Sequence, residues 1–303
     1  MPPDSRALFA ALRSHRSFLL AVAVLVVGFA WPLIQLALFA WDSSLYSHIL
    51  LIPFVSLYLI WERRSAVVNA TGAWRPVALL ALLPGLALLG WHAASSGWTW
   101  SVEDRLAATT ASFLLLLGAG FVGYLHTNTL RALAFPLGFL VFIIPVPEDV
   151  MNAMEVFLQH GSAAAARAFF ALTGPPLFYQ DLVFQFPGGF SMQIAPECSG
   201  IHSSLVLFIT SVLAGHLFLR SGWKRAALTF FVIPLALVRN GFRVFVIGQL
   251  CVRISPDMIN SWIHRKGGPV FFVLSLVPFL LLLFVLVKYD RPAAAKPSPR
   301  PPS

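Results

Sequence analysis

The chain has 303 residues, of which 58% are hydrophobic and only 11% are charged, and its formal net charge at pH 7 is +9. A soluble globular domain carries about a quarter charged residues, so this chain has too little polar surface to cover a water-facing body. The composition therefore excludes an ordinary soluble domain and indicates membrane lipid as the main solvent. In a membrane protein an excess of Lys and Arg records topology, because basic loops stay in the cytoplasm.

Long apolar stretches recur along the chain at lengths that suit membrane crossing. A spanning helix needs roughly 20 apolar residues. The candidate segments are 17–40, 46–61, 76–92, 106–125, 131–146, 201–219, 226–250 and 270–288. The first is too long for a signal-peptide core and lacks a small-residue cleavage site, so we interpret it as a retained anchor. The expected fold class is an all-α integral membrane protein, a polytopic bundle of about eight transmembrane helices.

The distribution of basic residues orients these segments. With the N-terminus in the cytoplasm, about two thirds of the 21 Lys and Arg residues fall at inner ends, which predicts that both termini are cytoplasmic. No basic run is interleaved with aromatic residues, so we expect no nucleic-acid partner. The stretch 290–303, rich in Pro, Ala and basic residues, is expected to be a disordered cytoplasmic tail after a membrane domain over 1–289.

One connection is long, and the predicted topology makes it the extracytoplasmic loop over residues 147–200. Met151, Met154, Phe157 and Leu158 recur at helical spacing, which predicts a helix along the membrane surface. The stretch 182–194 alternates apolar and polar residues around a Pro-Gly-Gly turn, which predicts a short hairpin.

Three side chains fall at one depth on the predicted outer face. Cys198 lies at the outer mouth of the sixth segment, and His264 lies just before the eighth. Arg243 lies about 18 residues past Arg225 at the inner end of the seventh segment, and at about 1.5 Å per residue this is roughly 27 Å, nearly the hydrocarbon thickness. Ionisable groups at membrane depth are by default functional candidates.

This set of side chains is chemically coherent. A thiol becomes a nucleophile beside a base or a positive charge. An imidazole can take its proton and return it to a leaving amine. A guanidinium can stabilise the oxyanion that forms when a carbonyl is attacked. The residues therefore predict acyl transfer or peptide cleavage at the membrane surface.

Neighbouring side chains leave alternatives open. Arg239 lies one helical turn deeper and could replace Arg243, or pair with a buried acceptor. His202 follows Cys198 by four residues, so it could be the base or half of a metal site; too few other thiols or acids lie near to complete four ligands, and we expect no metal or cofactor. His48 is predicted at the outer end of the second segment, where it would line the pocket.

Three short motifs occur in a fixed order in the second half of the chain. Residues 197–201 read Glu-Cys-Ser-Gly-Ile, residues 240–243 read Asn-Gly-Phe-Arg, and His264 is followed by Gly267-Gly268. This order resembles the exosortases, a membrane-embedded transpeptidase-like family that includes the archaeosortases. The resemblance covers nearly the whole chain. One departure is His202, at a position where related sequences more often carry Arg.

The resemblance implies roles for these residues. By that likeness Cys198 attacks the peptide carbonyl, Arg243 steadies the oxyanion and His264 moves protons. Five further residues are substrate-binding candidates: His48, Glu197, His202, Arg239 and Asn240.

The resemblance also implies partners and a location. The substrates would be exported proteins with a PEP-CTERM-like signal at the C-terminus, namely a short Pro-containing motif, a transmembrane helix and a basic tail. The cleaved protein would pass to an unidentified acceptor nucleophile. The enzyme would lie in the inner membrane of a Gram-negative, exopolysaccharide-producing bacterium, with its active site on the periplasmic side.

Other classes of function compete with this interpretation. A transporter would use the intramembrane arginines as an anion site, but it predicts paired broken helices in two similar halves, and the sequence has no such symmetry. A polysaccharide-handling membrane transferase would need acidic groups, for which Glu103, Asp104, Glu148 and Asp149 are available. A non-catalytic assembly factor would leave the thiol, guanidinium and imidazole unexplained.

Overall fold

The computed structural model describes residues 16–65, 75–95, 100–173, 178–180, 182–186, 191–194, 199–263 and 267–290. Contacts divide the chain into two compact units, Met1–Met151 and Asn152–Ser303. Both units are mainly helical, and the described strands form one small sheet in the second unit. The all-α fold class with a short hairpin is thereby confirmed.

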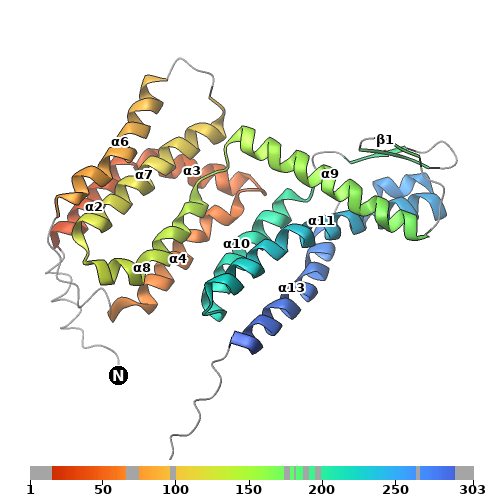
Figure 1. Cartoon of the computed structure of the whole chain (residues 1–303). Helices are drawn as coiled ribbons and strands as arrows, with labels where there is room; N and C mark the ends of the chain where they lie inside the picture. The colour runs from red at the N-terminus through yellow and green to blue at the C-terminus, as the bar shows by residue number, and fades with distance from the viewer. Residues whose placement is uncertain are drawn as a thin grey trace, which may run out of the picture. The chain divides into compact units, whose positions relative to one another are not determined.

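The first unit is built around a hairpin of two long helices. Its elements are α2 (Arg16–Gly28), α3 (Ala30–Asp42), η1 (Ser47–Leu50), α4 (Ile52–Glu62), α6 (Val77–Ala94), α7 (Val102–Tyr124), α8 (Thr127–Phe139) and η2 (Leu140–Ile143). Helices α6 and α7 pack along each other (Figure 1), and a side chain at Gly85 of α6 would meet Leu116 Cδ2 of α7 at 2.9 Å. The missing side chain at Gly85 therefore lets the two helices approach closely.

Arg75 closes the far end of α7. Its backbone N–H donates to the Gly123 carbonyl at 2.8 Å, and its guanidinium donates to the carbonyls of Val122, at 3.1 Å, and Leu125. The last carbonyls of a helix have no partner within the helix, and a basic residue is a favourable cap for them. Arg75 thus completes the end of α7.

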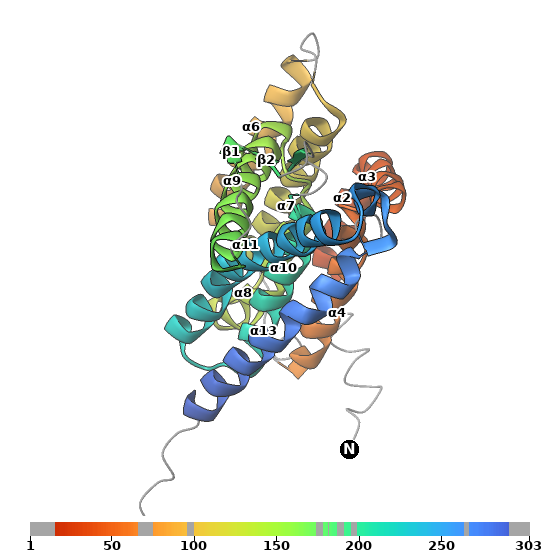
Figure 2. The same ribbon diagram turned by 90° about the vertical axis from the view of Figure 1, so that its right-hand side faces the viewer.

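The second unit contains α9 (Glu148–Thr173), which begins just before the boundary, α10 (Ile201–Phe218), α11 (Gly222–Arg253), η4 (Pro256–Asn260) and α13 (Gly268–Asp290), with strands β1 (Phe178–Gln180), β2 (Val183–Gln185) and β3 (Ser191–Gln193). Helices α10, α11 and α13 lie side by side in Figure 1 and Figure 2. Their shared core includes the buried Leu207, Leu228 and Phe279.

Asp290 fastens one end of these three helices together. Its carboxylate lies 2.8 Å from the Lys224 ammonium and accepts hydrogen bonds from the backbone N–H groups of Arg220 and Ser221. The last residue of α13 is therefore bound to the turn between α10 and α11. Because α10 and α13 both end here, both begin at the opposite end of the bundle, beside the middle of α11.

Helix α11 continues past that level and carries a second hydrophobic core. At about 1.5 Å per residue its 32 residues measure roughly 48 Å, against about 30 Å for a hydrocarbon core. The second core joins α9, the sheet and the end of α11, and we call this assembly the sheet lobe. Its buried residues are Ala163, Ala166, Phe170, Phe184, Phe186, Met192, Ile194, Val244, Ile247 and Cys251.

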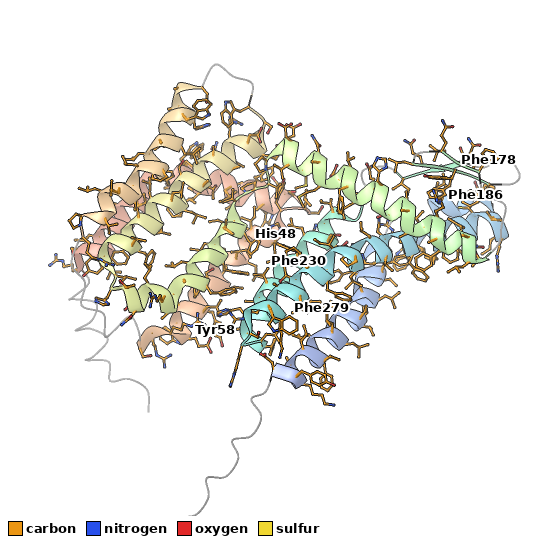
Figure 3. The ribbon with its side chains drawn as sticks, in the orientation of Figure 1. His48, Tyr58, Phe178, Phe186, Phe230 and Phe279 are labelled. Atoms are coloured by element: carbon orange, nitrogen blue, oxygen red, sulfur yellow. The ribbon has the colours of Figure 1, made fainter. Side chains whose placement is uncertain are left out.

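The sheet of this lobe has the order β1-β2-β3 with antiparallel neighbours. Phe184 pairs with Tyr179 on one side and with Met192 on the other, and Phe184 and Met192 are buried. Figure 3 shows Phe186 on the helix side of the sheet, whereas Phe178 is 81% exposed. The predicted hairpin is confirmed as β2 and β3; β1 was not predicted, because three residues without a turn motif give no periodic signal.

Small residues let α9 and α11 cross closely. A side chain at Gly241 would lie 2.5 Å from Ala165 Cβ and 2.8 Å from the Ala166 backbone nitrogen. At the same crossing the Asn240 amide donates to Ser162 Oγ at 3.0 Å, and both residues are buried. Close backbone approach at small residues, with a polar bond across it, is typical of helix pairs in membranes.

Each of the predicted spans has a helical counterpart among the described residues. Among the described residues five helices are long and apolar enough to cross a membrane, or up to seven if each of two bent pairs forms one span, where the sequence predicts about eight. The segment 17–40 is broken into α2 and α3 with a bend of 63°. Pro32 explains the break, because its ring clashes with the carbonyl four residues earlier, at Gly28. The segment 46–61 is helical but short.

We expect Gly241→Ala to lower the free energy of unfolding by about 1–3 kcal/mol, because the added methyl group overpacks a crossing formed by backbone atoms. The measurement is thermal unfolding of the purified protein in detergent. Gly118→Ala in α7 is the matched control, since no atom lies within 4 Å of the added carbon. Equal unfolding midpoints for the two variants would contradict the close approach of α9 and α11.

Candidate functional site

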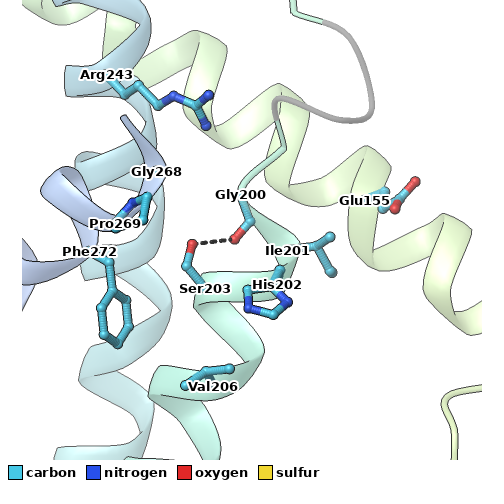
Figure 4. Close-up of a pocket in the computed structure, with 10 residues that line it drawn as sticks. All are labelled: Glu155, Gly200, Ile201, His202, Ser203, Val206, Arg243, Gly268, Pro269 and Phe272. Atoms are coloured by element: carbon cyan, nitrogen blue, oxygen red, sulfur yellow. Dashed lines mark hydrogen bonds between the residues drawn. The ribbon is translucent and has the colours of Figure 1, made fainter. Parts of the chain in front are cut away.

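A cavity of about 530 Å³ lies in the second unit where α10 and α13 begin. It receives side chains from α9, α10, α11 and α13 (Figure 4). The lining residues are Glu155, Gly200, Ile201, His202, Ser203, Val206, Arg243, Gly268, Pro269 and Phe272. The wall thus combines a few polar and charged groups with apolar side chains, which is typical of a ligand site.

Gly200 forms the turn that starts α10. Its φ angle is +75°, a left-handed conformation that glycine adopts without steric cost. A side chain here would also lie 3.1 Å from Asn240 Oδ1 and 3.2 Å from Arg239 Nη2, both on α11. The glycine of the Cys-Ser-Gly motif is therefore required by backbone geometry and by the approach of α11.

Arg239 is bound to this turn. Its side chain is 7% exposed, and Nη2 donates to the Gly200 carbonyl at 3.2 Å and to Ser204 Oγ at 3.1 Å. The hydroxyls of Ser203 and Ser204 donate to the same carbonyl at 3.0 and 2.8 Å. The sequence left open a pairing of Arg239 with a buried acceptor, and in the structure Arg239 bonds to two half-buried acceptors.

Arg243 lies one turn further along α11 and faces the cavity. Figure 4 shows its side chain extending from α11 over the end of α10 where Gly200 lies. The side chain is half-buried, so its guanidinium is accessible from the cavity. His202 also lines the cavity and is exposed. Asn240 is 2% exposed and bonded to Ser162, and among the described residues neither Asn240 nor Arg239 belongs to the lining.

Three predicted site residues, Glu197, Cys198 and His264, lie outside the described residues. Their neighbours along the chain are described. Gly200, two residues after Cys198, and Gly268, four residues after His264, both line the cavity.

Gly267, between His264 and α13, has no room for a side chain. An added Cβ would lie 2.1 Å from the Ile263 carbonyl oxygen, to which the Gly267 N–H donates at 3.0 Å. A glycine therefore follows each of the two predicted catalytic residues within three positions of the sequence: Gly200 follows Cys198, and Gly267 follows His264.

His48 belongs to the first unit. It lies in η1, where its Nδ1 is 3.1 Å from the Leu45 carbonyl oxygen. Its place in the site stays a prediction. Cys251 is a free thiol, 3% exposed in the core of the sheet lobe.

Glu155, which brings a carboxylate to the cavity from α9, was not predicted. The sequence nevertheless contains a signal that could have identified this residue. Glu155 interrupts the helical series of Met151 and Leu158, both buried, with an acid that is only half-buried. The apolar lining from Val206, Pro269 and Phe272 was also missed, because it depends on how α13 packs against α10.

A comparison with protein families matches the description Transmembrane exosortase (Exosortase_EpsH) over residues 40–281, which is most of the chain and includes every described residue that lines the cavity. The chain belongs to the transmembrane exosortase family. It is accordingly a multi-pass membrane protein, and the resemblance drawn from the motifs is confirmed. Searches of curated proteins and of solved structures found no match.

We expect Gly200→Ala to loosen the start of α10. The left-handed conformation costs a residue with a side chain roughly 1–2 kcal/mol, which corresponds to a factor of about 5–30 in a local opening equilibrium. Amide hydrogen exchange in the first turn of α10 should accelerate by that factor. Gly268→Ala is the control, since it lines the same cavity with no atom within 4 Å of the added carbon. Unchanged exchange in Gly200→Ala would mean that the turn is not held as described.

Proposed function

We propose that this exosortase is a cysteine peptidase or transpeptidase embedded in the membrane, which cleaves PEP-CTERM-like C-terminal signals of exported proteins. The observation that carries the proposal is the position of Arg243. Its side chain extends over a cavity lined by Gly200 and Gly268, and these glycines are near neighbours in the chain of Cys198 and His264. One cavity is therefore lined by a guanidinium and by two residues that closely follow the proposed thiol and imidazole in the sequence.

The reaction proceeds in two acyl transfers. His264 takes the thiol proton, and the Cys198 thiolate forms a bond to the scissile carbonyl carbon while the carbonyl electrons move to oxygen. Arg243 donates hydrogen bonds to that oxyanion. When the carbonyl re-forms, the C–N bond breaks and His264 returns the proton to the leaving amine. The thioester on Cys198 is then attacked by water or by an acceptor amine, which restores the thiol.

The dimensions of the second unit support the proposed location. The turn fastened by Asp290 carries the basic residues Arg220, Lys224 and Arg225, which indicates a cytoplasmic end. From Gly222 to Arg243 the helix rises by roughly 32 Å, close to the hydrocarbon thickness. The cavity then faces the periplasm at the level where a membrane-anchored substrate leaves the lipid, with both termini in the cytoplasm.

Among the acids that a polysaccharide-handling transferase would need, Asp104 has a structural role instead. Asp104 Oδ1 accepts from the Glu148 backbone N–H at 3.0 Å at the start of α9, and Ser101 Oγ accepts from the Asp104 backbone N–H at 3.1 Å. Glu103 and Asp104 also lie in the first turn of α7, where carboxylates are favoured by the helix dipole. These contacts favour capping over catalysis.

Cells that carry Cys198→Ala or Cys198→Ser should fail to process a reporter with a PEP-CTERM-like tail, because the other thiol, Cys251, is buried in the core of the sheet lobe. The readout is the size and release of the reporter, with membrane insertion of each variant confirmed. Cys251→Ala is the matched control, and it should leave processing unchanged. Normal processing of a validated reporter by Cys198→Ala would remove the thiol from the mechanism and bring the transport reading forward.

The base can be assigned by comparing two histidines. If His264 moves the protons, His264→Ala should lower kcat by about 10²–10⁴-fold, whereas His202→Ala should change it by less than about tenfold. The measurement is reporter turnover by purified enzyme at several pH values. His202 lines the cavity, so the reverse order of losses would make His202 the base.

A further inference from the structure

Arg239 is a buried cation in the middle of a membrane-spanning helix. It is 7% exposed, and among the described residues no carboxylate lies within ion-pair distance of it. Burying a guanidinium at membrane depth is costly, and such residues are retained for function by default. Its two hydrogen bonds, to the Gly200 carbonyl and to Ser204 Oγ, both go to the start of α10.

The Gly200 carbonyl receives an unusual number of donors. The Ser204 backbone N–H lies 3.0 Å away, the hydroxyls of Ser203 and Ser204 lie 3.0 and 2.8 Å away, and Arg239 Nη2 lies 3.2 Å away. A backbone carbonyl has two lone pairs, so this oxygen is saturated and its peptide plane is held from two helices. A cationic donor makes a stronger hydrogen bond than a neutral one, and Arg239 is the donor that α11 supplies.

A fixed peptide plane at Gly200, together with its φ angle of +75°, fixes the direction from which the preceding chain enters α10. The nucleophile proposed above lies two residues before this turn. Arg239 therefore holds the turn that follows the thiol in the sequence, although it is not among the described residues that line the cavity.

The other terminal nitrogen of the Arg239 guanidinium, Nη1, is evidence against a role in stability alone. Nη1 is buried and has no hydrogen-bond partner among the described residues. A buried donor without a partner is costly, and apolar residues of similar volume often replace buried charged groups without loss of stability. A residue kept only to stabilise the helix bundle would therefore not be an arginine with one end unpaired.

We infer that Arg239 is a positioning residue for the nucleophile. It holds the Gly200 turn through the carbonyl and the Ser204 hydroxyl, while Arg243, one helical turn away, acts on the substrate from the cavity. The inference rests on the proposed function, since positioning matters only if Cys198 attacks a carbonyl. The two arginines of α11 then have separate tasks.

The test compares Arg239→Met, Arg239→Lys and Arg243→Lys in purified full-length enzyme, with a reporter bearing a PEP-CTERM-like tail as the probe. A misplacement of about 1 Å can cost about 10²-fold in rate, so Arg239→Met should lose about 10²-fold in kcat with little change in KM and no loss in thermal stability. Arg239→Lys should recover part of the rate, because an ammonium can still reach one of the two acceptors. Arg243→Lys should lose about 10²–10³-fold, as for the loss of an oxyanion donor.

Two further variants complete the design. Ser204→Ala removes one acceptor of Arg239, so its loss of rate should not add to that of Arg239→Met, whereas it should add to that of Arg243→Lys. Arg253→Met, exposed in the last turn of α11, is the control and should retain full activity.

Three outcomes would overturn the inference. These are full activity of Arg239→Met, a raised KM at unchanged kcat, or a loss of folded protein that matches the loss of rate. Failure of the proposed function can be distinguished from failure of this inference. If the proposed function is wrong, Cys198→Ala retains activity, whatever the activity of Arg239→Met.

Discussion

The Gly200 carbonyl is the junction on which the rest of the site depends. Gly200 directly precedes α10, and its carbonyl accepts hydrogen bonds from two serine hydroxyls of α10 and from the buried Arg239 guanidinium of α11. The junction is possible only because Gly200 has no side chain, and because α9 holds α11 in place through Asn240 and Ser162. Once α10 and α11 are joined there, Arg243 is directed to the cavity by helical geometry alone.

The opposite end of the bundle sets the depth of that cavity. Asp290 binds Lys224 and the turn before α11, so α10, α11 and α13 share one level at their joined ends. Their lengths then bring the starts of α10 and α13 to one level beside Arg243. The remainder of α11 supports the sheet lobe, whose core lies beyond that level. This arrangement explains how one membrane protein combines a bundle of apolar helices with a cavity at the end where α10 and α13 begin.

Much of this could be read from the sequence where the signal is local. The hairpin and the helix after residue 147 follow from alternation and periodicity, and the family follows from three motifs in order. What could not be read depends on packing between distant segments. The contact of Arg239 with Gly200, the approach of Phe272 to the cavity and the crossing at Gly241 arise from helix docking, which leaves no periodic trace. The bend after Gly28 has a local cause in Pro32, but it was not predicted because the segment 17–40 is hydrophobic throughout.

The most direct test of the account is to trap the covalent intermediate. Purified enzyme would be mixed with a reporter bearing a PEP-CTERM-like tail, quenched in acid within a turnover and mapped by peptide mass spectrometry. We expect a hydroxylamine-sensitive thioester on Cys198 that contains the N-terminal part of the reporter, and none on Cys251. Two results together would contradict the mechanism: wild-type enzyme that cleaves the reporter with no adduct on Cys198, and Cys198→Ala enzyme that cleaves it equally well.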